Sequence, residues 1–204
     1  DSLKLIKEQI AQLLEAFPDQ PILAIGITQP GFVDSSAGVN YSYTTADPLF
    51  NLRQEIEREF TIPTYIENDS SAIAIAEQKF GQAQHTAHVM VVNLNWGVGL
   101  GMIINHQLFR GNNGYAGEFS HIPLSNTNQL CSCGKTGCLE VEASITSALE
   151  FVRQQVQQGE SSMLTHITAE KGRIQLNDFI HAYEQGDQLA IRSIKSIAYM
   201  LGKG

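Results

Sequence analysis

Three cysteines within eight residues limit most strongly what this chain can become. All of them lie in the segment Cys131-Ser-Cys-Gly-Lys-Thr-Gly-Cys138. An odd number of cysteines so close together suits a metal better than a disulfide framework. Gly134 and Gly137 allow the backbone to fold around one ion, and His121 lies ten residues upstream. We therefore expect a closed, structural zinc site formed by His121, Cys131, Cys133 and Cys138. The alternative is three buried or incidental cysteines.

Composition excludes several classes of protein. With 204 residues, 43% hydrophobic and 17% charged, the chain is long and apolar enough to bury a core. No apolar run approaches the ~20 residues of a membrane helix, and no signal-type N-terminus is present. We expect a cytoplasmic protein with reduced thiols and no membrane insertion. The net charge of -8, without a Lys/Arg cluster, argues against nucleic-acid binding by this segment itself.

The first part of the chain alternates helices and strands. Apolar spacing predicts helices over 3–17 and 52–60, and a third over 70–80 that ends at Gly81. Short β-branched runs predict strands over 22–27 and 64–66.

The second part begins as a β-meander. Strands are expected over 89–94, over 101–105 and after the turn-like pair Asn105-His106. Helices are expected over 145–156, 176–183 and 189–201, with Gly186-Asp187 as the break before the last one. This order predicts an α/β fold. Because no strand follows the last helix, we expect a fragment of a longer protein.

Two groups of polar residues are candidates for binding. Asn68 and Asp69 follow a strand and begin a helix, where an Asp is often only an N-cap. Glu118 and Glu140 flank the cysteine segment, so the metal loop would tether both. Isolated carboxylates are usually solvated. Together with His121, however, these four residues offer the hydrogen-bonding groups that binding several sugar hydroxyls requires.

A third candidate is the turn Asn95-Trp96-Gly97-Val98-Gly99-Leu100-Gly101. The alternating glycines Gly97, Gly99 and Gly101 suit a close backbone approach to a nucleotide phosphate, and they suit a tight turn equally well.

Taken in order, the PG pair, the ND pair, the glycine-rich turn, the GE-x-x-H element and the C-x-C-G-x-x-G-C-x-E element resemble the ROK family (repressors, open reading frames and kinases). The resemblance is closest to sugar-responsive repressors of the N-acetylglucosamine and xylose type. It runs from Ile22 to about Ile145 and continues weakly to Gly204. It implies an actin-like ATPase (ribonuclease H-like) fold with a zinc-stabilised loop, a first lobe over about 1–85 and a second over 86–204.

The resemblance also implies roles for single residues. The sugar pocket would be lined by Asn68, Asp69, Glu118, His121 and Glu140, with His121 also binding zinc. In family kinases the position of Asp69 is the general base. Family kinases normally carry Thr in the glycine turn where this chain has Trp96, and the family's Asp-Gly-Gly-Thr phosphate loop is absent from this sequence.

The favoured interpretation is the sugar-sensing domain of a transcriptional repressor in carbohydrate metabolism. Operator DNA would be bound by an N-terminal domain outside this chain, and the protein would form a homodimer or a higher homo-oligomer. The first alternative is an ATP-dependent sugar kinase that uses ATP and Mg, with Asp69 as its base. The second is a sugar-binding protein without catalysis or DNA binding. The sequence does not identify the sugar.

Overall fold

The computed structural model describes residues 2–112 and 114–204, and it divides the chain into two compact units. Unit 1 comprises residues 1–91 and 101–117, and unit 2 comprises residues 92–100 and 118–204. The strands β5 (Val89–Leu94) and β6 (Val98–Ile104) contribute residues to both units.

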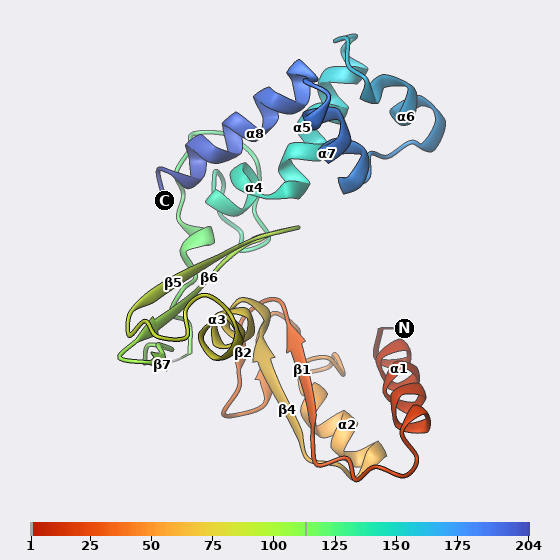
Figure 1. The fold of residues 1–204 in the computed structure, drawn as a ribbon, viewed down its shortest axis with the longest axis vertical. Coiled ribbons are helices and arrows are strands. Elements are labelled where there is room, and N and C mark those ends of the chain that lie inside the picture. Colours follow the sequence, from red (N-terminus) through yellow and green to blue (C-terminus); the bar gives the residue numbers. More distant parts are fainter. Residues whose placement is uncertain (1, 113) are drawn as a thin grey trace. The chain divides into compact units, whose positions relative to one another are not determined.

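Unit 1 is built on a two-stranded parallel sheet. Strand β1 (Ile25–Gln29) pairs with β4 (Thr64–Asn68) in a register that places Gln29 opposite Asn68. Helices α1 (Ser2–Ala16), α2 (Leu52–Phe60) and α3 (Asp69–Phe80) accompany these strands, as Figure 1 shows. The carboxyl ends of both parallel strands therefore meet at one edge, where Asn68 and Asp69 lie.

The core of unit 1 follows from the apolar faces of its helices. Leu52 and Ile56 are fully buried one helical turn apart on α2, and Ile10 of α1 packs in the same cluster. Asn51 caps α2 by accepting a hydrogen bond from the Gln54 N–H, and Thr61 ends the helix in the left-handed conformation.

Two short strands complete this part of unit 1. Strands β2 (Val33–Asp34) and β3 (Val39–Asn40) form an antiparallel hairpin that the sequence pattern does not predict. Two residues per strand are too few for an alternation of apolar and polar residues to be visible. This hairpin carries one wall of a pocket described below.

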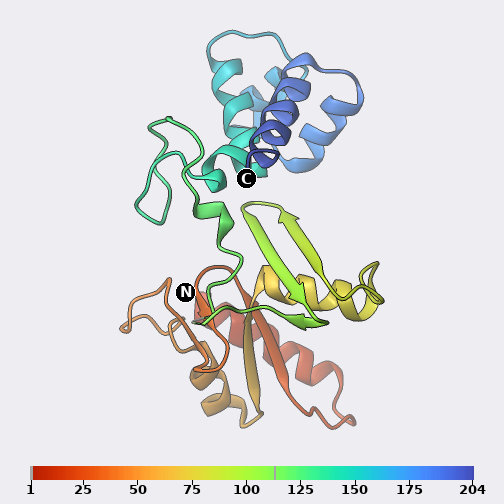
Figure 2. The ribbon, with the colours of Figure 1, turned by 90° about the vertical axis from the view of Figure 1, so that its left-hand side faces the viewer.

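The predicted meander is present. Strand β6 lies between β5 and β7 (Gln107–Leu108), and β6 pairs with β7 in antiparallel register; Figure 2 shows this sheet in yellow-green. The turn residues Asn105 and His106 both have positive φ, as a type I′ turn requires. Strand β6 begins at Val98, three residues earlier than predicted.

Unit 2 is mainly helical. It contains the 3-10 turn η1 (Phe119–His121) and the helices α4 (Leu139–Ala143), α5 (Ile145–Gln157), α6 (Leu164–Lys171), α7 (Leu176–Glu184) and α8 (Gln188–Leu201). Helices α4, α5 and α7 all contact α8, and the group is drawn in cyan and blue in Figure 2. Leu139, Val152, Leu189 and Ala190 are buried in their shared core.

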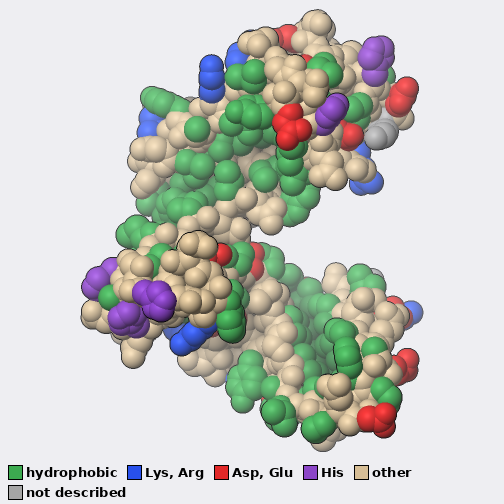
Figure 3. All heavy atoms as spheres, in the orientation of Figure 1, with side chains coloured by type: hydrophobic (Ala, Val, Ile, Leu, Met, Phe, Trp, Pro, Cys, Tyr) green, Lys and Arg blue, Asp and Glu red, His purple; other side chains and the backbone are tan. Residues whose placement is uncertain are grey.

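Most predicted elements agree with the structure, and the differences have local causes. The strand expected over 22–27 begins only at Ile25, because the preceding residues Pro21 to Ala24 form no strand ladder. Helix α6 and the turn η1 were not predicted. Hydrophobic side chains reach the surface of both units in the space-filling view (Figure 3). In the described part of the chain no helix is long and apolar enough to cross a membrane.

Candidate metal centre and neighbouring site residues

The four side chains that the sequence predicts as metal ligands lie together in unit 2. The ligand atoms of His121, Cys131, Cys133 and Cys138 all lie within 4.8 Å of one another. Cys131 and Cys138 are buried, whereas Cys133 and His121 are partly exposed. This is the cluster of metal-binding side chains found among the residues that the structure describes.

Two distances within the cluster match the edges of a tetrahedral metal site. The Sγ atoms of Cys133 and Cys138 are 3.7 Å apart, and Cys131 Sγ lies 3.5 Å from His121 Nδ1. Bonds of ~2.3 Å to sulfur and ~2.0 Å to nitrogen give tetrahedral edges of roughly the same lengths. The residues present therefore fit a four-coordinate metal with three sulfur ligands and one nitrogen ligand.

Backbone contacts fold the loop around this point. The Cys131 N–H donates to the Lys135 carbonyl at 2.8 Å, and the Gly134 N–H donates to the Cys131 carbonyl at 2.9 Å. Gly137 has φ +68°, and a Cβ there would lie 2.1 Å from the carbonyl oxygen of Ser125. The conformation of this loop thus requires glycine at position 137.

Protonation differs among the thiols. Burial, together with the neighbouring thiols, raises the pKa of Cys138 to about 12. A backbone hydrogen bond at Lys135 lowers the pKa of Cys133.

The other ring nitrogen of His121 faces a carboxylate. His121 Nε2 lies 3.7 Å from Glu118 Oε2, and Glu118 immediately precedes the turn η1 that ends at His121. The short turn therefore brings both residues to the metal cluster. Two of the predicted binding residues thus lie close together.

Glu140 is held by the glycine turn. Its Oε2 accepts a hydrogen bond from the Val98 N–H at 2.9 Å, and a Cβ on Gly97 would lie only 2.4 Å from its Oε1. Glu140 lies in the first turn of α4, directly after the metal-loop residues Cys138 and Leu139. Glu140, Gly97 and Trp96 belong to unit 2, and Glu140 and Trp96 line one cavity of about 460 Å³ there.

Two glycines of the turn, Gly97 and Gly101, differ in their surroundings. Gly97 gives space to Glu140. A Cβ on Gly101 would lie 2.3 Å from Ala74 Cβ of helix α3, so Gly101 allows close packing of strand against helix. These contacts explain Gly97 and Gly101 by packing alone. Trp96 has 59% of its surface exposed.

In unit 1, Asn68 rather than Asp69 caps helix α3. Asn68 Oδ1 accepts from the Ser71 N–H at 3.0 Å, and Asn68 Nδ2 donates to the Gly31 carbonyl at 3.1 Å. The interpretation of Asp69 as an N-cap is therefore wrong, because the chain enters the helix one residue earlier. Asp69 is half-buried, and its Oδ1 accepts from the Ser70 N–H at 2.8 Å.

Sequence reasoning missed two residues at this edge of the sheet. Glu67 accepts hydrogen bonds from the Arg110 guanidinium and from the Asn68 N–H, so it helps to fix Asn68. Gln29 is buried at the end of β1, and its Oε1 has no partner within the described residues. Glu67 could have been recognised from the sequence, because it is a charged residue directly before the ND pair. Gln29 can be recognised only from its burial in the structure.

Comparison with known proteins establishes the class. The sequence matches the ROK family over residues 2–204, and the chain belongs to that family. Its fold is the actin-like ATPase fold of ROK kinases and regulators.

Both repressors and kinases are among its relatives. It is 26% identical to the xylose repressor of Bacillus subtilis, over 97% of this chain and 48% of that protein. It is 29% identical to the transcriptional dual regulator NagC of Escherichia coli, over 95% of this chain and 47% of NagC. The chain thus spans about half the length of these relatives, and the predicted resemblance to repressors of this type is confirmed.

Two solved structures share the fold with similar TM-scores and similar sequence identities. A ROK family transcriptional regulator, a homologue of the E. coli MLC protein, superposes with a TM-score of 0.80 at 29% identity, over 99% of this chain and 51% of that one. A ROK family glucokinase from Streptomyces griseus, solved with glucose and AMPPNP, gives 0.82 at 28% identity, over 98% and 65%. The fold therefore does not separate regulators from kinases.

Proposed function

We propose that this chain is the sugar-sensing part of a ROK-family transcriptional repressor. A monosaccharide or a sugar derivative binds here and changes the affinity of the whole protein for operator DNA. The DNA is bound by an N-terminal domain outside this chain, and the protein acts as a homodimer or a higher homo-oligomer. The similarity to the xylose repressor and NagC supports this function.

Trp96 is the observation that carries the proposal. It lies in the turn between β5 and β6, where the resemblance to family kinases implies the small hydroxyl residue Thr. An exposed indole would crowd a phosphate bound at this turn and would supply no hydroxyl to it, whereas phosphoryl transfer depends on positioning and charge stabilisation. Binding a sugar has no such requirement.

The proposed sugar-binding groups are assigned unit by unit. Asn68 and Asp69 belong to unit 1, and Glu118, His121 and Glu140 belong to unit 2. Carboxylates accept hydrogen bonds from vicinal hydroxyls. The Asn68 amide retains one N–H and one lone pair beyond its two structural hydrogen bonds.

We propose that the metal is zinc and that its role is structural. With Nδ1 of His121 on the metal, Nε2 would carry the ring proton, and it lies 3.7 Å from Glu118 Oε2. The metal would thereby fix the imidazole tautomer for contact with a sugar hydroxyl. It would also anchor the loop that leads into Glu140.

A sugar kinase is the second candidate. Asp69, the position of the family's general base, is present and half-buried, and the S. griseus glucokinase shares the fold. In that case ATP and Mg would bind at the turn that contains Gly97, Gly99 and Gly101. A sugar-binding protein with neither activity is the third candidate.

Calorimetry and a gel-shift titration of the full-length protein test the proposal. Monosaccharides such as glucose, xylose and N-acetylglucosamine, and their 6-phosphates, are titrated into the parent and the Glu140→Ala variant. We expect Glu140→Ala to lose about 1–3 kcal/mol of sugar binding, whereas Glu184→Ala, an exposed carboxylate on α7, binds as the parent does. Unchanged sugar binding by Glu140→Ala would contradict the assignment of the sugar-binding residues. Unchanged operator affinity in the presence of bound sugar would contradict the effector role.

A further inference from the structure

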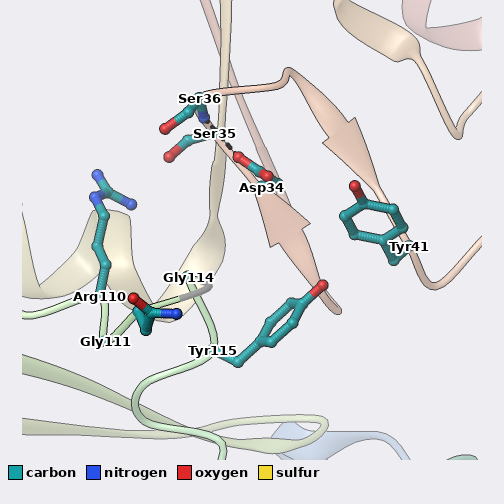
Figure 4. Close-up of a pocket in the computed structure, with 9 residues that line it drawn as sticks. Asp34, Ser35, Ser36, Tyr41, Arg110, Gly111, Gly114 and Tyr115 are labelled. Carbon is teal, nitrogen blue, oxygen red and sulfur yellow. Dashed lines mark hydrogen bonds between the residues drawn. The ribbon is translucent and has the colours of Figure 1, made fainter.

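Unit 1 contains a polar pocket that none of the residues discussed above as sugar ligands line. It has a volume of about 480 Å³, within the range of about 300–1,000 Å³ that is typical of ligand sites. One wall is formed by Asp34 at the end of β2, by Ser35 and Ser36 of the β2–β3 turn and by Tyr41 after β3. The other wall is the segment after β7 that contains Arg110, Gly111 and Tyr115. Figure 4 shows the labelled side chains around this space.

The turn that carries the two serines is held from both sides. Asp34 Oδ1 accepts hydrogen bonds from the Ser36 and Ala37 N–H groups at 3.0 and 2.9 Å, and the first is the dashed line in Figure 4. Arg53 of helix α2 donates to the Ser36 and Ala37 carbonyls. The serine hydroxyls are therefore presented on a fixed backbone.

The two tyrosines are fixed by ring contacts. The Tyr41 ring meets the Phe50 ring edge-on at 5.8 Å, and the Tyr115 ring meets the Phe32 ring at 5.7 Å. Tyr41 and Tyr115 nevertheless keep 51% and 40% of their surface exposed. Each ring is anchored on one side and remains available on another, which lowers the entropy cost of binding a flat apolar face.

Charge indicates the kind of ligand. Arg110 is paired with Glu67 through two of its nitrogens, and this hydrogen bonding raises the Arg110 pKa. The charged residues that line the pocket are Asp34 and Arg110, which have opposite signs, so the pocket offers no surplus charge to an anion or a cation. It offers hydroxyls, the remaining guanidinium N–H groups and two aromatic rings, which together suit a neutral polyhydroxylated ligand.

We propose that this pocket is a second carbohydrate site, which takes one unit of a neutral saccharide. It is independent of the proposed function, because none of its residues belongs to the set Asn68, Asp69, Glu118, His121 and Glu140. Its aromatic rings receive the apolar face of the sugar ring. Arg110 and the serines bind the hydroxyl edge.

The test uses the full-length protein with Asp69→Ala and Glu140→Ala combined, which disables the sugar-binding groups of the proposed function. Maltose, cellobiose and xylobiose are the probes, with glucose 6-phosphate as the anionic comparison. Saturation-transfer difference NMR detects binding, and calorimetry measures its strength. We expect the neutral disaccharides to bind in this background and glucose 6-phosphate to bind at least ten-fold more weakly, which is about 1.4 kcal/mol.

Variants of the pocket locate the binding. Tyr115→Ala and Ser36→Phe are expected to weaken the retained binding about ten-fold or more, the first by removing a ring and the second by filling the pocket. Tyr65→Ala is the matched control, since Tyr65 is 65% exposed in strand β4. Ser36→Phe keeps the test valid where Tyr115→Ala fails to fold.

The outcomes separate the two proposals. Absence of disaccharide binding in the double variant, or equal binding by Ser36→Phe and Tyr65→Ala, overturns the second site and leaves the proposed function intact. Monosaccharide binding by the parent that is insensitive to Glu140→Ala overturns the sugar-binding groups of the proposed function and leaves the second site intact.

Discussion

The Glu140 carboxylate accepts a hydrogen bond from the Val98 backbone N–H at 2.9 Å, which joins residues 42 positions apart. Glu140 follows the metal loop in the first turn of α4, and Val98 is the first residue of strand β6. The contact therefore links the metal loop to the glycine turn within unit 2. A change at either end is expected to affect the other.

Gly97→Ala is predicted to weaken sugar binding without removing the metal. The new Cβ would lie 2.4 Å from Glu140 Oε1, closer than nonbonded atoms can approach, so the carboxylate must move. Loss of a charged hydrogen-bond partner costs about 1–3 kcal/mol, and we expect a loss of affinity of this order in calorimetry.

Gly26→Ala is the matched control. A Cβ on Gly26 of β1 would meet no atom within 4 Å, so this variant should bind sugar as the parent does. Equal affinities for Gly97→Ala and the parent would show that the position of Glu140 does not matter for binding.

The chain is predicted to hold one zinc ion, and Cys138→Ser is predicted to lose it. Cys138 is fully buried, and its Sγ lies 3.7 Å from that of Cys133. Since metal binding is coupled to folding, loss of zinc should lower the melting temperature and increase hydrogen exchange between residues 118 and 143. Elemental analysis and exchange mass spectrometry measure these effects.

Ser132→Ala provides the comparison within the same loop. Ser132 lies between two of the cysteines and is exposed, so its removal should leave one zinc per chain. Freshly purified, reduced parent protein without stoichiometric metal would be incompatible with the proposed site.

The metal ligands could be predicted from the sequence because they depend on local spacing. Cys131, Cys133 and Cys138 lie so close along the chain that few backbone conformations are possible between them. Glycines in the same segment permit the turns that bring the three thiols together. His121 was more difficult, since its approach depends on the turn η1. That turn has no apolar periodicity to reveal it.

Contacts between distant segments could not be predicted in the same way. The pair Glu67–Arg110 joins residues 43 positions apart, and Glu140 meets Val98 only after both α4 and β6 have formed. Whether Asn68 or Asp69 is the N-cap of α3 depends on a shift of one residue in the start of the helix. Helix ends are the positions that are hardest to assign to within one residue.

The full-length protein is predicted not to phosphorylate sugars at an ordinary kinase rate. Trp96 presents an indole at the turn, and its backbone carbonyl is held by the Thr146 hydroxyl at 2.7 Å. This hydrogen bond stabilises the observed conformation of the turn. Coupled assays of ADP release with glucose, xylose and N-acetylglucosamine measure turnover, with the S. griseus glucokinase as positive control. Sugar-dependent turnover of about 1–100 per second would favour the kinase.

Asp187 joins two helices in unit 2. Its Oδ1 caps α8 by accepting from the Leu189 and Ala190 N–H groups, and its Oδ2 accepts from the Met163 N–H at 2.8 Å and the Ser162 hydroxyl at 3.0 Å. Burial alone would raise the pKa of this carboxyl. The hydrogen bonds outweigh burial, and the pKa lies below its ordinary value.

Asp187→Asn is accordingly predicted to destabilise unit 2 by about 2 kcal/mol at pH 7, because it removes the charged acceptor from a buried cap. Since the folded pKa is lowered, the charge stabilises the folded state above the ordinary value of about 3.9. This stabilisation is lost as the pH falls through the lowered folded value. Urea unfolding of parent and variant at pH 7 and at decreasing pH below 4 should show the difference shrinking. Asp19→Asn, a change at an exposed turn residue, should have the stability of the parent at every pH. If the difference in unfolding free energy between Asp187→Asn and the parent does not shrink in acid, the loss of stability comes from the changed shape of the side chain and not from its charge.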